Sequence, residues 1–117
     1  MKPASPLNPS ALPVSEVTKA LELVHYQAGA VVSREIVKRP TGSVTIFAFD
    51  ESQGLSEHTA PFDALVQILE GEVEIKVAGN PHLLRSGDLI LLPALHPHAL
   101  KAITKFKMSL TMIRSQT

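Results

Sequence analysis

Strict alternation of hydrophobic and polar residues marks two segments in the second half of the chain. In residues 72–77, Val73, Ile75 and Val77 alternate with charged residues, so the three apolar side chains share one face of an extended segment. Residues 106–113 alternate in the same way, with an apolar row of Phe106, Met108, Leu110 and Met112. We predict that both segments are strands with one face in a hydrophobic core.

Further short runs, rich in β-branched and large apolar residues, are also predicted to be strands. They are separated by glycine, proline, asparagine or aspartate, and they cover residues 31–37, 44–49, 64–69, 82–84, 89–92 and 99–103. The segments 78–81 and 85–88 each contain a glycine, which can supply the positive φ of a tight hairpin. Many short strands without a long helical pattern predict an all-β sandwich or barrel of the jelly-roll type.

The N-terminal part of the chain has a different pattern. Prolines at positions 3, 6, 9 and 13 disfavour a helix there and predict an extended arm. Residues 14–23 are predicted to form a short helix, with Ser15 as its N-cap and a thin apolar stripe of Val14, Val17 and Leu21. We therefore expect an arm and short helix over residues 1–30 and a barrel over residues 31–117, in one domain overall.

Composition narrows the possible functions. The chain has 117 residues, 44% of them hydrophobic, which is enough for one core. Eleven basic and eleven acidic residues cancel without forming a basic cluster, which argues against nucleic acid or an anionic membrane as partner. The absence of cysteine excludes disulfides, thiolate metal ligands and a cysteine nucleophile. Because the chain has no membrane-length apolar run and no signal-peptide core, we expect a soluble, cytoplasmic protein. The balanced charge favours a small molecule as its ligand.

Two stretches combine histidine with glycine or proline at specific spacings. They are HTAPFDALVQILEG (residues 58–71) and GDLILLPALHPH (residues 87–98). With these stretches the chain resembles a small single-domain cupin of the RmlC-like, conserved-barrel type. Its first motif, G-x5-H-x-H-x(3,4)-E-x6-G, matches at His58 and Gly71, and its second, G-x5-P-x-G-x2-H-x3-N, matches at Gly87, Pro93 and His98. The resemblance implies a double-stranded β-helix, the jelly-roll barrel of cupins.

The same resemblance implies a metal site that is degenerate in this chain. In metal-binding cupins, the two histidines and the glutamate of the first motif and the histidine of the second hold one divalent ion. Here Ala60 stands at the second histidine position and Ala64 at the glutamate position. Ala102 replaces the final asparagine, and Leu95 replaces the glycine of P-x-G, where a side chain would resist any positive φ.

His58 and His98 could still hold a divalent transition metal such as Fe, Mn, Ni or Zn if a third ligand replaced the missing ones. Asp63 is one candidate, although the strand pleat points it away from the face of His58 and Ala64 unless a bulge at 60–61 reverses it. The other candidate is His96, because Pro97 favours an extended backbone in which His96 and His98 share a face.

Two functions remain open. In the first, the barrel pocket binds a small organic ligand without a full metal-ligand set. It is then either a non-catalytic binding module or a site where His58 acts as general acid or base, with His98 as its hydrogen-bonding or substrate-orienting partner. Its apolar walls would include Phe47, Phe49, Leu65 and Leu91. In the second, an altered ligand set around the two histidines holds a metal for dioxygenase, isomerase or lyase chemistry. Exposed strand edges, together with the frequent dimerisation of small cupins, predict a homodimer.

Overall fold

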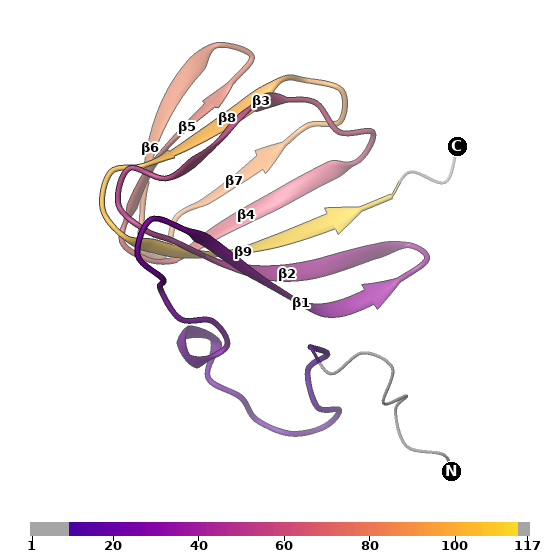
Figure 1. Ribbon diagram of the computed structural model, residues 1–117. Coiled ribbons are helices and arrows are strands. Elements are labelled where there is room, and N and C mark those ends of the chain that lie inside the picture. The colour runs from indigo at the N-terminus through magenta and orange to yellow at the C-terminus, as the bar shows by residue number, and fades with distance from the viewer. Residues whose placement is uncertain (1–9, 115–117) are drawn as a thin grey trace.

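The computed structural model describes residues 10–114, which fold into two antiparallel β-sheets that face each other (Figure 1). The five-stranded sheet has the order β1-β2-β9-β4-β7, with strands Val31–Arg39, Gly42–Phe49, Phe106–Ile113, Asp63–Glu70 and Leu89–Leu92. The four-stranded sheet has the order β3-β8-β5-β6, with strands Gly54–His58, His98–Ala102, Glu72–Val77 and Asn80–Arg85. This arrangement confirms the all-β jelly roll predicted from the sequence.

All the predicted runs are strands, but strand β3 was missed. Residues 54–58 contain a single large apolar side chain, Leu55, which packs against the core, while the residues on either side of it are exposed. An edge strand that buries only one side chain produces no alternating pattern. The motif stretch from His58 to Gly71 therefore contains the end of β3, a connection, strand β4 and the glycine that follows it.

The helix predicted over residues 14–23 is wrong. Only a three-residue 3-10 helix, η1 (Ala20–Glu22), forms there, and Ser15 has a φ of 62° instead of the extended backbone of an N-cap. Val14 and Val17 are exposed, so a helix at this place would bury no apolar stripe. Short helices depend on such packing for most of their stability. No helix within residues 10–114 is long and apolar enough to cross a membrane.

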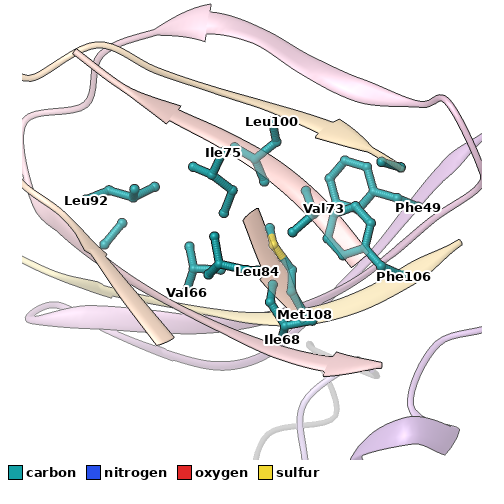
Figure 2. Close-up of a cluster of buried hydrophobic side chains, with 12 residues drawn as sticks. Phe49, Val66, Ile68, Val73, Ile75, Leu84, Leu92, Leu100, Phe106 and Met108 are labelled. Carbon is teal, nitrogen blue, oxygen red and sulfur yellow. The ribbon is translucent and has the colours of Figure 1, made fainter. Parts of the chain in front are cut away.

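The space between the sheets is filled by apolar side chains (Figure 2). The rings of Phe49 and Phe106 stack at one end of this cluster, with centroids 4.5 Å apart and planes 11° apart. Leu92 lies at the opposite end in Figure 2. The predicted core rows are confirmed: Val73, Ile75, Phe106 and Met108 are buried, and Val77, Leu110 and Met112 pack against the cluster while partly exposed.

A second, smaller core attaches the N-terminal segment to the outer face of the five-stranded sheet. Leu23 and Val24 pack there with three residues of β1 and β2, namely Ile36, Ile46 and Ala48. Polar contacts reinforce the attachment: the Lys107 Nζ donates to the Leu21 carbonyl at 2.6 Å, and the Tyr26 hydroxyl donates to Glu70 Oε2 at 2.6 Å. The ammonium of Lys107 also lies 5.0 Å from the centre of the Tyr26 ring.

Gly71, the closing glycine of the first motif, connects β4 to β5 at a point of close backbone approach. Its φ is 83°, and a Cβ at this position would collide with the Lys105 carbonyl and with Phe106. Glycine is required here for both reasons, because any other L-residue would add a strained conformation and a steric clash. The motif glycine therefore serves the barrel structure.

Candidate functional site

The pairing of β3 with β8 brings His58 and His98 together. The two residues are direct partners across the strands, and the ladder is irregular between Leu55 and His58. Their Nε2 atoms lie 3.1 Å apart, and the rings meet edge to face at 71° with centroids 4.3 Å apart. His98 shares its strand face with Leu100 and Ala102, which belong to the barrel core, whereas His58 is exposed. The pair therefore consists of one imidazole at the barrel interior and one imidazole exposed to solvent.

Backbone carbonyl groups orient both rings. The Nδ1 of His58 is 2.8 Å from the Ser56 carbonyl oxygen, and the Nδ1 of His98 is 3.3 Å from the carbonyl oxygen of His96. A carbonyl only accepts hydrogen bonds, so these contacts assign a proton to each Nδ1, which leaves each Nε2 as the unprotonated nitrogen of a neutral ring. Two lone pairs then face each other at 3.1 Å. The arrangement favours a positive charge between them, supplied by a proton or a cation.

The environments of the two imidazoles differ. His98 is only 7% exposed, and burial lowers its pKa below the ordinary value. Repulsion from a charged His58 lowers this pKa further, and the contact with the His96 carbonyl opposes the shift. His98 is therefore held as the neutral, accepting partner. A proton shared by the pair belongs on the Nε2 of the exposed His58, from where it is donated to the Nε2 of His98.

The other candidate ligands lie apart from this pair. Asp63 is exposed and its Oδ1 accepts a hydrogen bond from the Ala94 backbone N–H at 2.8 Å, while the next residue, Ala64, is buried in the core. The His96 side chain is exposed, and this residue contributes its carbonyl oxygen to the pair. Within residues 10–114, no three His, Asp or Glu side chains are grouped so that they could hold a metal ion.

The residues at the substituted motif positions contribute to the structure of the barrel. Ala64 and Ala102 are buried core residues, and the carbonyl of Ala60 accepts a hydrogen bond from the Leu95 N–H at 2.8 Å. Leu95 has a φ of 67°, so the positive-φ turn of the motif is kept in spite of the leucine. The side chain of Leu95 is 72% exposed, which leaves it room in this conformation, at a backbone cost of about 1–2 kcal/mol.

Two of the four residues expected to form apolar pocket walls lie on the outer face of the sheet. Phe49 is buried in the barrel core, and Phe47 packs against it. Leu65 and Leu91 are cross-strand partners whose neighbours Ala64 and Leu92 point into the core, so both leucines lie on the outer face of the sheet. The prediction that Leu65 and Leu91 line the pocket is therefore wrong. It failed because a one-residue step along a strand reverses the direction of the side chain.

The backbone acceptors of the site had no signal in the sequence. The Ser56 and His96 carbonyl groups orient the rings, and each lies two residues before the histidine that it contacts. Any residue type can supply a carbonyl, so only the path of the chain identifies these partners. Ser56 also belongs to β3, the strand that the sequence pattern missed.

The fold and the histidine pair define a β-barrel protein of the jelly-roll class with a polar site at the end of two adjacent strands. The Cupin domain family matches residues 45–114, which is more than half of the chain. The chain belongs to the cupin family.

Solved structures agree with this assignment. A conserved protein of unknown function from Streptococcus pyogenes is 30% identical, with a TM-score of 0.85 over 91% of this chain and 93% of that chain. A cupin 2 conserved barrel domain protein from Leptotrichia buccalis is 39% identical, with a TM-score of 0.78 over 80% of this chain and 46% of that chain. Salicylate 1,2-dioxygenase from Pseudaminobacter salicylatoxidans, at 18% identity and a TM-score of 0.68 over 74% of this chain and 27% of that chain, shares the fold. No curated protein matches this chain in sequence.

Metal ligation in this family can be tested against the geometry of the pair. Two nitrogens bound to one cation at about 2.1 Å lie about 3.0–3.4 Å apart when the angle at the metal is between about 90° and 109°. The Nε2 separation of 3.1 Å falls within this range. Metal centres in proteins nevertheless use three or four protein ligands, and Ala60 and Ala64 offer none. The donor set of this chain therefore does not fit a complete metal centre.

Proposed function

We propose that this cupin binds a small organic molecule at the end of the barrel where His58 and His98 meet, and that the two imidazoles contact it as a proton-sharing pair. The observation that carries the proposal is the 3.1 Å approach of the two Nε2 atoms, with each Nδ1 turned to a carbonyl. His98 shares its strand face with the core residues Leu100 and Ala102, so the pair supplies polar contacts next to the apolar side chains of the barrel. Small-molecule sites combine apolar walls with a few placed polar groups in this way.

The pair can also move a proton to or from a bound molecule. When His58 carries the proton, a basic atom of the ligand can take it from Nε2, while neutral His98 accepts a hydrogen bond from an acidic group of the ligand. Burial keeps His98 in its neutral form, because its pKa is lowered. The arrangement thus supports acid–base chemistry on a bound molecule as well as binding alone.

A fragment screen read by NMR tests the proposal. The Cε1–H resonances of the imidazoles report contact, so fragments that bind at the site shift the signals of both His58 and His98. The variant His98→Gln is expected to bind such fragments about tenfold more weakly, since one lost hydrogen bond is worth up to about 1.4 kcal/mol. His82→Gln on β6 is the control and leaves binding unchanged. Fragments that bind but leave both histidine signals unmoved in the wild type would contradict the proposal.

A metal-dependent function is the second candidate, and it is favoured by one observation. The Nε2 spacing suits two neighbouring ligands of a divalent transition metal, and the contacts between Nδ1 atoms and carbonyls are of the kind that orient metal-ligating histidines. Dioxygenase, isomerase or lyase chemistry would require a further ligand besides the two histidines, because Ala60 and Ala64 supply none. Near-stoichiometric metal in protein purified without chelator, lost in the His58→Ala, His98→Ala double variant, would favour this candidate over the first.

We also propose that the protein is a homodimer. Strand β7 is the last strand of the five-stranded sheet, and its Leu89 and Leu91 are 59% and 54% exposed. Sheet edges with exposed apolar residues are usually covered by another chain or element, and a chain with no net charge does not repel a second copy of itself. Light scattering at micromolar concentration is expected to give twice the monomer mass. The double variant Leu89→Lys, Leu91→Lys should give the monomer mass, and a monomeric wild type would contradict the proposal.

A further inference from the structure

A second polar feature lies at the same end of the barrel as the histidine pair. It is a hollow of 140 Å³, named here the basic hollow and lined by Glu35, Lys38, Arg39, Gly42, Ser43, Phe62, Met112 and Arg114. The sequence shows no cluster of basic residues, but the fold brings Arg114 from beyond β9 to Lys38 and Arg39 near the end of β1. The hollow is therefore a product of the strand order β1-β2-β9.

The basic hollow opens on the inner side of the five-stranded sheet. Ser43 pairs with both Lys38 and Met112, and Met112 packs against the barrel core, so this row of three residues shares the face that points between the sheets. Phe62 comes from the connection that starts directly after His58. In Figure 1 the tip of the β1–β2 hairpin, the end of β9 and the connection from β3 to β4 all lie on the right-hand side.

The charges that line the hollow are unbalanced. Three cationic side chains face one carboxylate, that of Glu35, which leaves an excess of two positive charges in a chain with no net charge. In residues 10–114 the ion pair that forms joins Arg85 to Glu72, and neither Lys38 nor Arg114 forms a direct ion pair with a carboxylate there. Arg39 is oriented by a hydrogen bond from its Nη1 to the Lys38 carbonyl at 2.8 Å.

We propose that the basic hollow binds the carboxylate of a small organic acid, with the apolar body of the acid against Phe62 and Met112. This inference rests on the proposed function, because it names the class of molecule that reaches the histidine pair. The volume of the hollow limits the size of the acid. A cavity of about 150 Å³ holds one benzene ring, and the hollow measures 140 Å³. A carboxylate pairs well with a guanidinium through two parallel hydrogen bonds, which Arg114 or Arg39 can supply.

Benzoate and benzamide are matched probes for this site. They have nearly the same shape, but only benzoate carries a charge, so the hollow should bind benzoate at least about tenfold more tightly at low ionic strength. Binding is followed by amide shifts of Ser43 and Met112, and the histidine Cε1–H signals are recorded in the same titration. Benzoate affinity should also fall when salt is raised from about 20 to about 200 mM, because exposed charges are screened over this range.

Single substitutions identify the side chains that bind the carboxylate of benzoate. Lys38→Gln and Arg114→Gln should each weaken benzoate binding by about fivefold or more while leaving benzamide unaffected, and Glu35→Gln should strengthen it by removing a repulsive carboxylate. Arg85→Gln is the control, since Arg85 is already paired with Glu72 on the four-stranded sheet. Dispersed amide spectra confirm that each variant folds. Equal affinity for benzoate and benzamide, or benzoate binding that the Lys38 and Arg114 variants leave intact, would overturn the inference.

The histidine signals separate this inference from the proposed function. Benzoate that shifts Ser43, Met112 and both imidazoles supports both proposals. If benzoate shifts the signals of the hollow but of neither imidazole, the result supports the anion site. It then contradicts the proposal that one molecule contacts both the hollow and the histidine pair. Benzamide that shifts the imidazoles as strongly as benzoate supports the proposed function and contradicts the anion site. Failure of benzoate to bind the hollow at millimolar concentration would also overturn the anion site.

Discussion

His58 and His98 face each other across strands β3 and β8 with their Nε2 atoms 3.1 Å apart, and a backbone carbonyl lies against the Nδ1 of each ring. The pKa of His98 is lowered by burial and also by His58, because a charged His58 ring disfavours a proton on His98. The pair remains although Ala60 and Ala64 occupy the other ligand positions of the family motif. What remains of the metal motif is therefore an ordered pair of imidazoles with one partner exposed and one buried.

The pKa of His98 should rise toward its ordinary value in the variant His58→Gln. Burial and repulsion from His58 both lower this pKa, and the variant removes only the repulsion, so the value should stay below that of a free histidine. Titration of the His98 Cε1–H resonance measures it, with His82→Gln as the control that should leave it unchanged. A His98 titration identical in wild type and His58→Gln would show that the rings do not interact.

Protein stability should fall as the pH drops below about 6.5, the ordinary pKa of histidine. The folded-state pKa of His98 is lowered, so between that pKa and the ordinary value the unfolded chain binds a proton that the folded chain does not bind. Stability is therefore lost as the pH falls through this window. Below the window, the contribution of His98 to the free energy of unfolding no longer changes with pH. Urea unfolding of wild type and His98→Gln measures the effect, and the variant should depend less on pH there. Parallel pH profiles of the two proteins would contradict this.

Leu95→Gly should stabilise the fold by about 0.5–1 kcal/mol. The substitution removes the strain of a leucine at a φ of 67°, partly offset by the greater freedom of glycine in the unfolded chain. Little buried surface is lost, because the side chain is mostly exposed. Leu95→Ala keeps the Cβ and should leave the free energy of unfolding within about 0.5 kcal/mol of wild type. A destabilised Leu95→Gly would mean that the leucine side chain stabilises the fold.

Gly71→Ala should destabilise the fold by about 3 kcal/mol or more, whereas Gly79→Ala should cost about 1 kcal/mol. Both glycines have nearly the same φ, 83° and 82°, so the backbone strain is matched. Only Gly71 lacks space, since its Cβ would collide with the Lys105 carbonyl, and nothing lies near a Cβ at Gly79. Chemical denaturation of the two variants gives the comparison. Equal losses would show that the close approach at Gly71 relaxes at little cost.

The alternation along the chain was enough to predict most of the barrel. The apolar rows of residues 72–77 and 106–113 lie on the core side as expected, because the two-residue period of a strand depends only on local sequence. Lys107 shows the limit of this argument. It occupies a polar position of its strand, yet it is 7% exposed because residues from the N-terminal segment pack over it. A pattern within one strand carries no information about a segment that covers it from elsewhere in the chain.

The candidate site was predictable in part. The family motifs identified His58 and His98, and the structure makes them partners across two strands. The carbonyl contacts that orient the rings, and the assembly of Lys38, Arg39 and Arg114 at one hollow, depend on strand order and register. Hydrophobic pattern and motif spacing encode neither property directly, so neither feature could be found before the fold was known.

Long-range proton–nitrogen NMR spectra of protein labelled with ¹⁵N-histidine test the central claim most directly, because they report the protonation of each ring nitrogen. We predict that His98 carries its proton on Nδ1, and that its Nε2 is the acceptor of any proton shared with the Nε2 of His58. Addition of a fragment that binds the site should change both Nε2 signals. A proton on the Nε2 of His98, with Nδ1 unprotonated, would contradict the proton-sharing pair.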